Sequence, residues 1–322
     1  AQFDSTITRT LDMLQNQSLT VELEELGLTQ DTAMYKVTLH NLAGHKFPSG
    51  YPARRAFIEF KVSDLDGNTI FASGLMDDAY ELTGQNPTYE PHYQVIRSED
   101  EVQIYEQVMG DVNDNVTTVL ERADHHIKDN RLAPLGFSTA HFAYDTVLIA
   151  GAALTDPDFN RQNDVEGSGT DEVYFHVPLD GFYGEVIVSA QVYYQSVPPK
   201  WNEEMFSVST PEIEFFEEMY WEVGADPVWI SGQLLETTTV GLNEILPADM
   251  VIFPNPSSDG IVKFQSTKQI DVVSVYSLGG DLIRNHQLNT ANGQITLPST
   301  AGTYLIVIQS GQERIVRRVM RL

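Results

Sequence analysis

The chain of 322 residues contains no cysteine, and this absence excludes several kinds of site. Without thiols there is no disulfide, no thiolate metal site, no cysteine nucleophile and no Cys-x-x-Cys-His attachment for a c-type haem. Basic residues are scarce, with 19 Lys and Arg against 46 Asp and Glu. The resulting net charge of −27 argues against a nucleic-acid partner, because phosphate binding requires clustered Lys and Arg. No apolar run approaches the roughly 20 residues of a membrane helix, so no transmembrane segment is expected.

Catalytic motifs are also missing. The sequence has no Gly-x-Ser-x-Gly elbow, no His-Glu-x-x-His pair, no phosphate loop and no dinucleotide fingerprint. The first residue is Ala1 rather than Met, so we expect the numbering to start at a processed or fragment end. We predict no catalytic residue, and an enzyme with an unrecognised site stays an alternative.

The charge divides the chain into two segments. Residues 247–322 hold seven basic and five acidic side chains, a net of +2. Subtracting these from the totals leaves 12 basic and 41 acidic side chains for residues 1–246, a net of −29. Such different balances indicate an acidic N-terminal domain, residues 1–246, and a C-terminal domain, residues 247–322.

The acidic segment has mainly the pattern of β-strands. Apolar and polar residues alternate with period two in the best examples, and turn residues separate the runs. The predicted strands are Met34–His40, Ala56–Val62, Thr69–Ala72, Thr146–Ala150, Glu172–Val177 and Glu185–Tyr194. The fold class is therefore all-β, mainly antiparallel, and a β-sandwich with a few short helices.

Three helices are expected. Ser5–Asn16 has a helical period, and residues 1–22 are interpreted as a helical lead-in. Asp100–Met109 is short and amphipathic, with acidic residues at its start. Pro211–Tyr220 follows Thr210, which suits an N-cap followed by proline at the first helical position.

The C-terminal segment has a regular rhythm of short strands and turns, which predicts a small seven-stranded, Ig-like β-sandwich. It contains Phe253-Pro-Asn-Pro256, the run Tyr276–Asp281, the run Leu297–Ile306 and the basic end Arg314–Leu322. In these motifs it resembles the type A sorting domain of the type IX secretion system of Bacteroidetes. The resemblance implies export by the type IX machinery, followed by release or attachment at the outer surface of a Gram-negative cell. The residues that it assigns to the signal are Pro254, Asn255, Pro256, Gly279, Gly302, Tyr304, Arg317 and Arg318.

A second resemblance covers about residues 6–223. It rests on Asn41–Arg55, Glu90-Pro-His-Tyr93, Val102–Met109, Ile127–Arg131, Asp156–Phe159 and Ala190–Pro199. These runs are similar to the β-rich region that follows the haem-binding part of some secreted multihaem c-type cytochromes. Because cysteine is absent, any haem would belong to an upstream or partner module.

Two histidines and two arginines are candidate site residues. His45 and His92 lie in proline-containing loops, and a neutral imidazole ligates iron well. Each is interpreted either as a residue near a partner's haem or as a loop-organising side chain. Arg54 and Arg55 stand out in an acidic domain, where they either order loops by ion pairing or meet haem propionates.

Calcium is the one metal that the sequence suggests. Hard oxygen ligands lie close together in one run, and Ca²⁺ takes six to eight of them. The candidate ligands are Asp156, Asp158, Asn160, Asn163, Asp164 and Glu166. Asp111, Asn113 and Asn115 form a weaker candidate. The alternative for both runs is the turn chemistry of Asp and Asn.

The favoured function is a non-catalytic domain of a secreted or surface protein, the accessory or scaffold part of an extracellular multihaem cytochrome in electron transfer. Its expected partners are the secretion machinery and a cytochrome module or identical subunits. A surface adhesin or carbohydrate-binding module is the main alternative.

Overall fold

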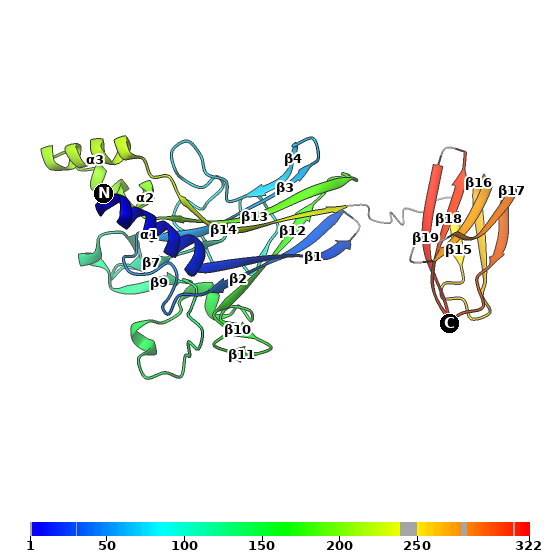
Figure 1. The fold of residues 1–322 in the computed structure, drawn as a ribbon, viewed down its shortest axis with the longest axis horizontal. Coiled ribbons are helices and arrows are strands. Elements are labelled where there is room, and N and C mark those ends of the chain that lie inside the picture. Colours follow the sequence, from blue (N-terminus) through cyan, green and yellow to red (C-terminus); the bar gives the residue numbers. More distant parts are fainter. Residues whose placement is uncertain (1, 30, 239–249, 278–281, 312) are drawn as a thin grey trace. The chain divides into compact units, whose positions relative to one another are not determined.

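The computed structural model describes residues 2–29, 31–238, 250–277, 282–311 and 313–322 (Figure 1). The chain forms two compact units, Ala1–Thr239 and Val240–Leu322. The domain boundary predicted after residue 246 lies outside the described residues. Each unit has its own hydrophobic core.

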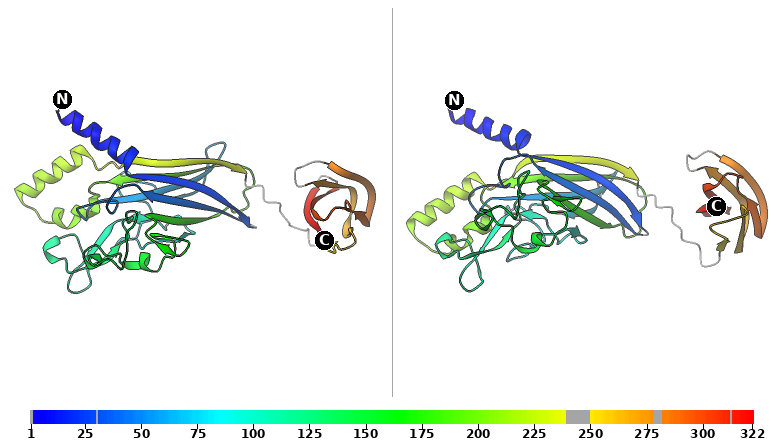
Figure 2. Two further views of the ribbon diagram at one scale, coloured as in Figure 1. Left: turned by 60° about the horizontal axis from the view of Figure 1, so that its bottom comes forward. Right: turned by 90° about the horizontal axis from the view of Figure 1, so that it is seen from below.

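The N-terminal unit is built on two sheets of mainly antiparallel strands (Figure 2). The first contains, in order, β1 (Leu19–Thr29), β2 (Thr32–Asn41), β12 (Thr170–Pro178) and β5 (Val95–Ile96). The second contains β14 (Val228–Thr238), β13 (Glu185–Gln195), β3 (Arg55–Asp64) and β4 (Thr69–Ser73), with β6 (Ile104–Tyr105) paired to β3. Only β5 joins its neighbour, β12, in parallel among these described strands.

The core of this unit lies between the two sheets. Alternate residues of β2, β3, β12 and β13 are buried, as period two requires of strands that cover a core on one face. Phe60 from the second sheet stacks on Phe175 from the first, with ring centroids 3.9 Å apart. This packing confirms the prediction of an all-β, mainly antiparallel domain.

Smaller elements surround the sheets. A three-stranded sheet holds β8 (Val116–Thr117), β7 (Gln107–Gly110) and β9 (His125–Asp129), and β10 (Arg161–Gln162) forms a hairpin with β11 (Val165–Glu166). The helices are α1 (Gln2–Gln17), α2 (Pro199–Phe206) and α3 (Pro211–Val223), with short 3₁₀ turns at Leu120–Arg122, Tyr144–Thr146 and Gly151–Leu154. Figure 1 draws α1, α2 and α3 at the same end of the unit.

Three local predictions were wrong. The helical lead-in ends at Gln17, because Leu19 onward alternates and pairs with β2. The helix expected at Asp100–Met109 is replaced by β6 and β7, since Ile104 and Tyr105 are buried and pair with β3. The strand expected at Thr146–Ala150 begins instead in a 3₁₀ turn.

The C-terminal unit shows five strands in its described part, where seven were predicted. They are β15 (Met250–Phe253), β16 (Ile261–Ser277), β17 (Leu282–Thr296), β18 (Gly302–Ser310) and β19 (Glu313–Arg321). Two of the seven predicted strands, Gly260–Gln265 and Asp271–Tyr276, are joined in β16 through a shift of register between Gln265 and Ile270, because Ile270 stays in the core. The predicted strands Leu282–Gln287 and Gln294–Leu297 are likewise joined by β17, in which the Phe264 ring occupies the space that a Cβ would need at Gly293.

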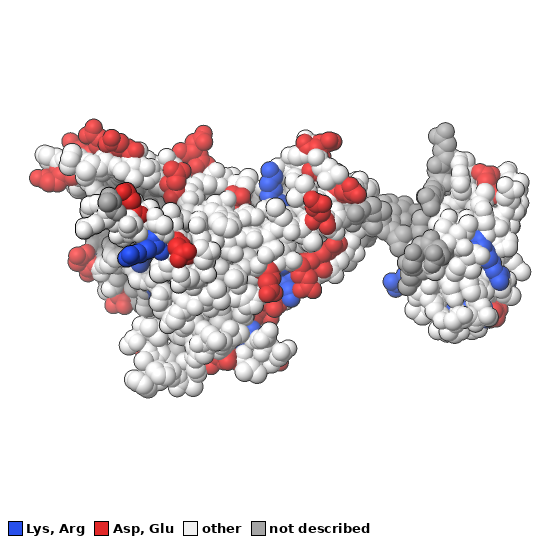
Figure 3. All heavy atoms as spheres, in the orientation of Figure 1, with Lys and Arg blue, Asp and Glu red and all other residues white. Residues whose placement is uncertain are grey.

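Among the charged side chains of residues 2–238, Asp and Glu are more widespread than Lys and Arg on the face drawn in Figure 3. α3 alone carries five, Glu212, Glu214, Glu217, Glu218 and Glu222, and no basic residue. The acidic balance found in the sequence is thus concentrated in part on this helix.

Candidate functional site

A group of buried polar side chains gathers around His92, in the loop before β5. Its Nε2 lies 3.0 Å from Oδ2 of Asp156 and 3.8 Å from Oδ2 of Asp171 in β12. The Tyr105 hydroxyl in β6 donates to the same oxygen of Asp171 over 2.6 Å. None of these four residues is more than 7% exposed. The group therefore ties the loop to both sheets and is shielded from solvent.

The hydrogen bonds around His92 fix where its proton lies. Nδ1 accepts from the amide of Gln103 over 2.9 Å and from that of Asn130 over 3.1 Å. The Asn130 amide cannot be reversed, because Nδ2 also donates to the Ile104 carbonyl and Oδ1 accepts from the Glu106 N–H. Nδ1 is therefore an acceptor, and Nε2 carries the proton that is donated to Asp156.

The same geometry disfavours a metal ion. One ligand atom each from His92, Asp156 and Asp171 lie within 4.8 Å of one another. A histidine bound to a metal through Nε2 keeps its proton on Nδ1 and donates it to an acceptor. Here Nδ1 faces two amide donors, so a neutral imidazole cannot serve as that ligand without losing both bonds. These residues do not fit a metal.

Asp171 is the member of the group whose ionisation is most disfavoured by burial. Burial raises its pKa from 3.8 to about 6, against the opposing effects of His92 and the Tyr105 hydroxyl. The folded pKa lies above the unfolded one, so the contribution of Asp171 to stability is present below about pH 4 and is lost as the pH rises through 6. A shift of this size corresponds to about 3 kcal/mol.

Asp171→Asn mimics the protonated carboxyl at every pH. We expect the free energy of unfolding of the variant to equal that of the wild type near pH 4. At pH 7 we expect it to exceed the wild-type value by up to about 3 kcal/mol. Urea unfolding followed by tryptophan fluorescence measures this, because all three Trp lie in the N-terminal unit. A stability difference that is the same at both pH values would contradict the raised pKa.

The first three predicted calcium ligands have separate partners. Asp156 belongs to the His92 group, and its Oδ1 accepts from the N–H of Asp158 over 2.8 Å. Asp158 accepts from Gln94 over 3.0 Å. Asn160 is buried and donates to the carbonyl of residue 137 over 3.1 Å. These contacts organise the chain locally.

The other three lie on and beside the β10–β11 hairpin. Asn163 and Asp164 form its turn with positive φ angles of 51° and 64°, as Asn and Asp tolerate. Glu166 accepts from the Ser138 hydroxyl and from the Thr139 N–H. The six candidate ligands therefore bond to different parts of the domain and do not form one cluster. Calcium binding by this run stays a prediction.

The weaker calcium candidate is the turn between β7 and β8. Oδ1 of Asp111 accepts from the N–H groups of Asn113 and Asn115 over 2.8 and 3.0 Å. These backbone donors lower the pKa of Asp111. Calcium binding at this turn stays a prediction as well.

His45 and Arg54 lie away from this buried group. His45 is exposed, and its Nδ1 lies 2.9 Å from the Lys46 carbonyl. Arg54 donates to the Ser49 carbonyl over 2.7 Å. Both side chains line a groove beside α1, which also includes Leu11 of that helix. His92, by contrast, has both ring nitrogens occupied inside the domain.

Arg55 is buried at the start of β3 and connects three segments. Nε donates to Gln195 over 2.7 Å, Nη1 to Gln85 over 3.1 Å and Nη2 to Glu81 over 2.9 Å. Glu81 in turn accepts from the N–H of Lys200 in the first turn of α2, over 2.6 Å. Arg55 therefore sets the position of α2 relative to the second sheet.

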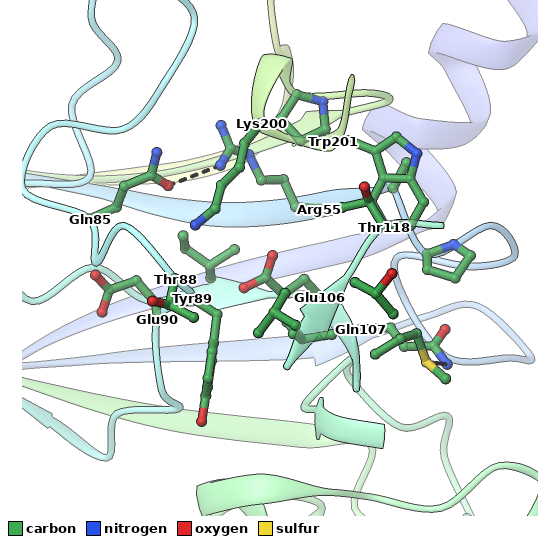
Figure 4. A pocket seen from close by; sticks show the side chains of 18 residues that line it. Arg55, Gln85, Thr88, Tyr89, Glu90, Glu106, Gln107, Thr118, Lys200 and Trp201 are labelled. Carbon is green, nitrogen blue, oxygen red and sulfur yellow. Dashed lines mark hydrogen bonds between the residues drawn. The ribbon is translucent and has the colours of Figure 1, made fainter. Parts of the chain in front are cut away.

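A pocket opens where these segments meet β7 (Figure 4). It is small, with an enclosed volume of about 60 Å³, and it is open at its mouth. Lys200 and Trp201 approach it from α2, and Glu106 and Gln107 from the side of β7. Its apolar wall includes Val116 and Met109.

Buried side chains beneath the pocket bind Glu106, one of its charged groups. Lys128 is 1% exposed, and its Nζ donates to the Ile104 carbonyl over 2.8 Å and to Oε1 of Glu106 over 3.1 Å. The Ile104 carbonyl also accepts from Asn130, which binds the Glu106 backbone as well. The His92 group and the pocket thus share one set of hydrogen bonds.

The sorting residues lie around β18 and β19. Pro254, Asn255 and Pro256 run beside β19, and the Asn255 side chain donates to the Arg318 carbonyl over 2.9 Å and accepts from the Met320 N–H over 3.0 Å. The main chain of Ser257 continues this pairing with Met320 and Leu322.

The remaining sorting residues belong to the strands themselves. Gly302 begins β18, and the buried Tyr304 donates its hydroxyl to the Thr300 carbonyl over 2.8 Å. Arg317 is buried and Arg318 is exposed on β19. Gly279 lies outside the described residues.

Comparison with known proteins identifies only the C-terminal unit. Residues 251–321 match the secretion system C-terminal sorting domain, which confirms that prediction. The chain is therefore a secreted or cell-surface-attached protein of the type IX pathway of Bacteroidetes. No helix in the described part of the chain is long and apolar enough to cross a membrane. No curated protein matches the sequence.

Solved structures with weak similarity include two that cover much of this chain. One is a penta-haem cytochrome c552 from Thermochromatium tepidum, with a TM-score of 0.39 and 14% identity, covering 70% of this chain and 40% of that protein. The other is the BSP domain of a biofilm-associated protein, with a TM-score of 0.23 and 8% identity, covering 100% of this chain and 55% of that protein. The chain thus spans about half the length of these proteins or less. Neither score establishes a shared fold, and the cytochrome resemblance stays a prediction.

Proposed function

We propose that the N-terminal unit is a non-catalytic accessory domain of a secreted protein, which docks through α3 on a partner module. The observation that carries this proposal is the exposed apolar face of α3. Phe215, Met219 and Val223 are four residues apart and share one face of the helix. Their exposed fractions are 61, 40 and 83%.

The inner side of α3 is already occupied, so its exposed side is available to a partner. Tyr220 packs on Phe206 of α2 and donates to the Val197 carbonyl over 2.9 Å, and Trp221 stacks on Tyr80. Apolar side chains rimmed by charge are typical of interaction surfaces. The five glutamates of α3 call for a partner with a cationic rim around an apolar centre.

The burial of the His92 group supports a non-catalytic role, because no solvent reaches it in quantity. The sequence resemblance makes a multihaem cytochrome module the first partner to test. A second copy of this chain is the alternative occupant, although its α3 would bring a second set of carboxylates against the first.

The test is the haem content of the full chain isolated from its own cells under native conditions. The wild type is expected to carry haem absorbance, and Phe215→Ser with Val223→Ser to reduce it at least tenfold, because two apolar contacts are lost. Leu65→Ser is the matched control, since Leu65 is 60% exposed in the β3–β4 turn. A wild-type chain isolated without haem would contradict the cytochrome partnership.

A further inference from the structure

The amine of Lys200 lies at the pocket without a carboxylate partner. Among the described residues no carboxylate lies within salt-bridge distance, and its one hydrogen bond runs to the Asn86 carbonyl over 3.2 Å. An ammonium has three donors, so two stay available. Figure 4 shows the amine pointing into the space in front of Glu106. Lys200 can therefore bind an anionic group that enters the pocket.

Glu106 supplies the opposite charge. Lys128 bonds to Oε1, and no hydrogen bond from the described residues reaches Oε2. An ionised carboxylate accepts through both oxygens, so Oε2 can accept from a bound donor. The backbone of Glu106 is held by Asn130 and its side chain by Lys128, so the acceptor is positioned before any ligand arrives.

Part of the lining next to these two groups is apolar. Trp201, Val116 and Met109 are among the residues that line the pocket. The Trp201 ring is held by an edge contact with Tyr51 at 5.4 Å between centroids. A ligand that fits must therefore combine a negative group, a positive donor and an apolar body within a short distance.

We propose that this pocket binds a free α-amino acid with an apolar side chain. Its carboxylate would be bound by the Lys200 amine, its ammonium by Oε2 of Glu106, and its side chain by Trp201. The two ends of the zwitterion match two opposite charges that this chain leaves open toward each other. This inference does not depend on the docking proposed for α3.

The experiment is isothermal titration of the full chain with L-leucine and with two truncated relatives. Isocaproate lacks the ammonium, and isoamylamine lacks the carboxylate. We expect L-leucine to bind and each relative to bind at least tenfold more weakly, because one buried charge is then left without its partner. No binding of L-leucine, or equal binding of all three compounds, would overturn the proposal.

A variant separates the pocket from the rest of the surface. Lys200→Met keeps the alkyl chain and removes the amine, and it should weaken L-leucine binding at least tenfold while leaving isoamylamine binding unchanged. Lys61→Met, in β3 and outside the pocket lining, is the matched control. Unchanged L-leucine binding in Lys200→Met would place the ligand elsewhere and refute the assignment. If Lys200→Met does not fold, the three-compound comparison on the wild type still decides.

Discussion

Replacing Arg55 by methionine is expected to destabilise the N-terminal unit by about 3–5 kcal/mol. Arg55 is 2% exposed, and its guanidinium bonds to Gln195, Gln85 and Glu81. Methionine fills a similar volume but leaves the Glu81 carboxylate without its cation and the two amides without donors. Because Glu81 also caps the start of α2, the loss should extend to that helix and to the pocket.

The neighbouring arginine provides the control. Arg54 is half-buried and bonds to one carbonyl, that of Ser49. Arg54→Met should therefore cost no more than about 1 kcal/mol. Urea unfolding of both full-length variants, followed by tryptophan fluorescence, gives the comparison. Equal stabilities would show that the Arg55 contacts do not hold the sheet, the loop and α2 together.

Asn130→Leu should cost about 3–5 kcal/mol through a different mechanism. Asn130 is fully buried and bonds to the Ile104 carbonyl, the Glu106 N–H and Nδ1 of His92. Leucine has a similar size but leaves the Glu106 N–H buried without an acceptor. The same change should loosen Glu106, so it should also weaken any ligand held in the pocket.

A double-mutant cycle with His92→Leu distinguishes a network from separate contacts. If Asn130 and His92 act together, the double variant should cost at least about 1 kcal/mol less than the sum of the single variants. Additive losses would mean that the two residues stabilise the domain independently. The nitrogen-15 NMR chemical shifts of the His92 ring in the wild type should also show that the proton is on Nε2.

The regular strands could be predicted from the sequence because burial on one face imposes alternation. Met34–His40 and Ala56–Val62 fall inside β2 and β3 for this reason. The helix predicted over Asp100–Met109 was wrong because the two strands there, on either side of Glu106, are too short to show the period of a strand. In the C-terminal unit, bulges were mistaken for ends, since a shift of register leaves polar residues inside a continuing strand.

The candidate site was harder to predict. His92 and Asp156 were both singled out, but nothing in their spacing indicates that they bond to each other across 64 residues. Lys200 and Glu106 line the same pocket because Arg55 and Glu81 position α2. The one local signal was the pair Arg54 and Arg55 in so acidic a segment. It indicated ion pairing and did not indicate a pocket.

The pairing of Asn255 with β19 determines when the sorting domain can complete its fold. Asn255 and its partner Met320 are 65 residues apart in the sequence. Until β19 has been synthesised, the segment Pro254–Pro256 lacks this partner. Its hydrogen bonds to β19 can therefore form only after strands β15 to β18 have been made.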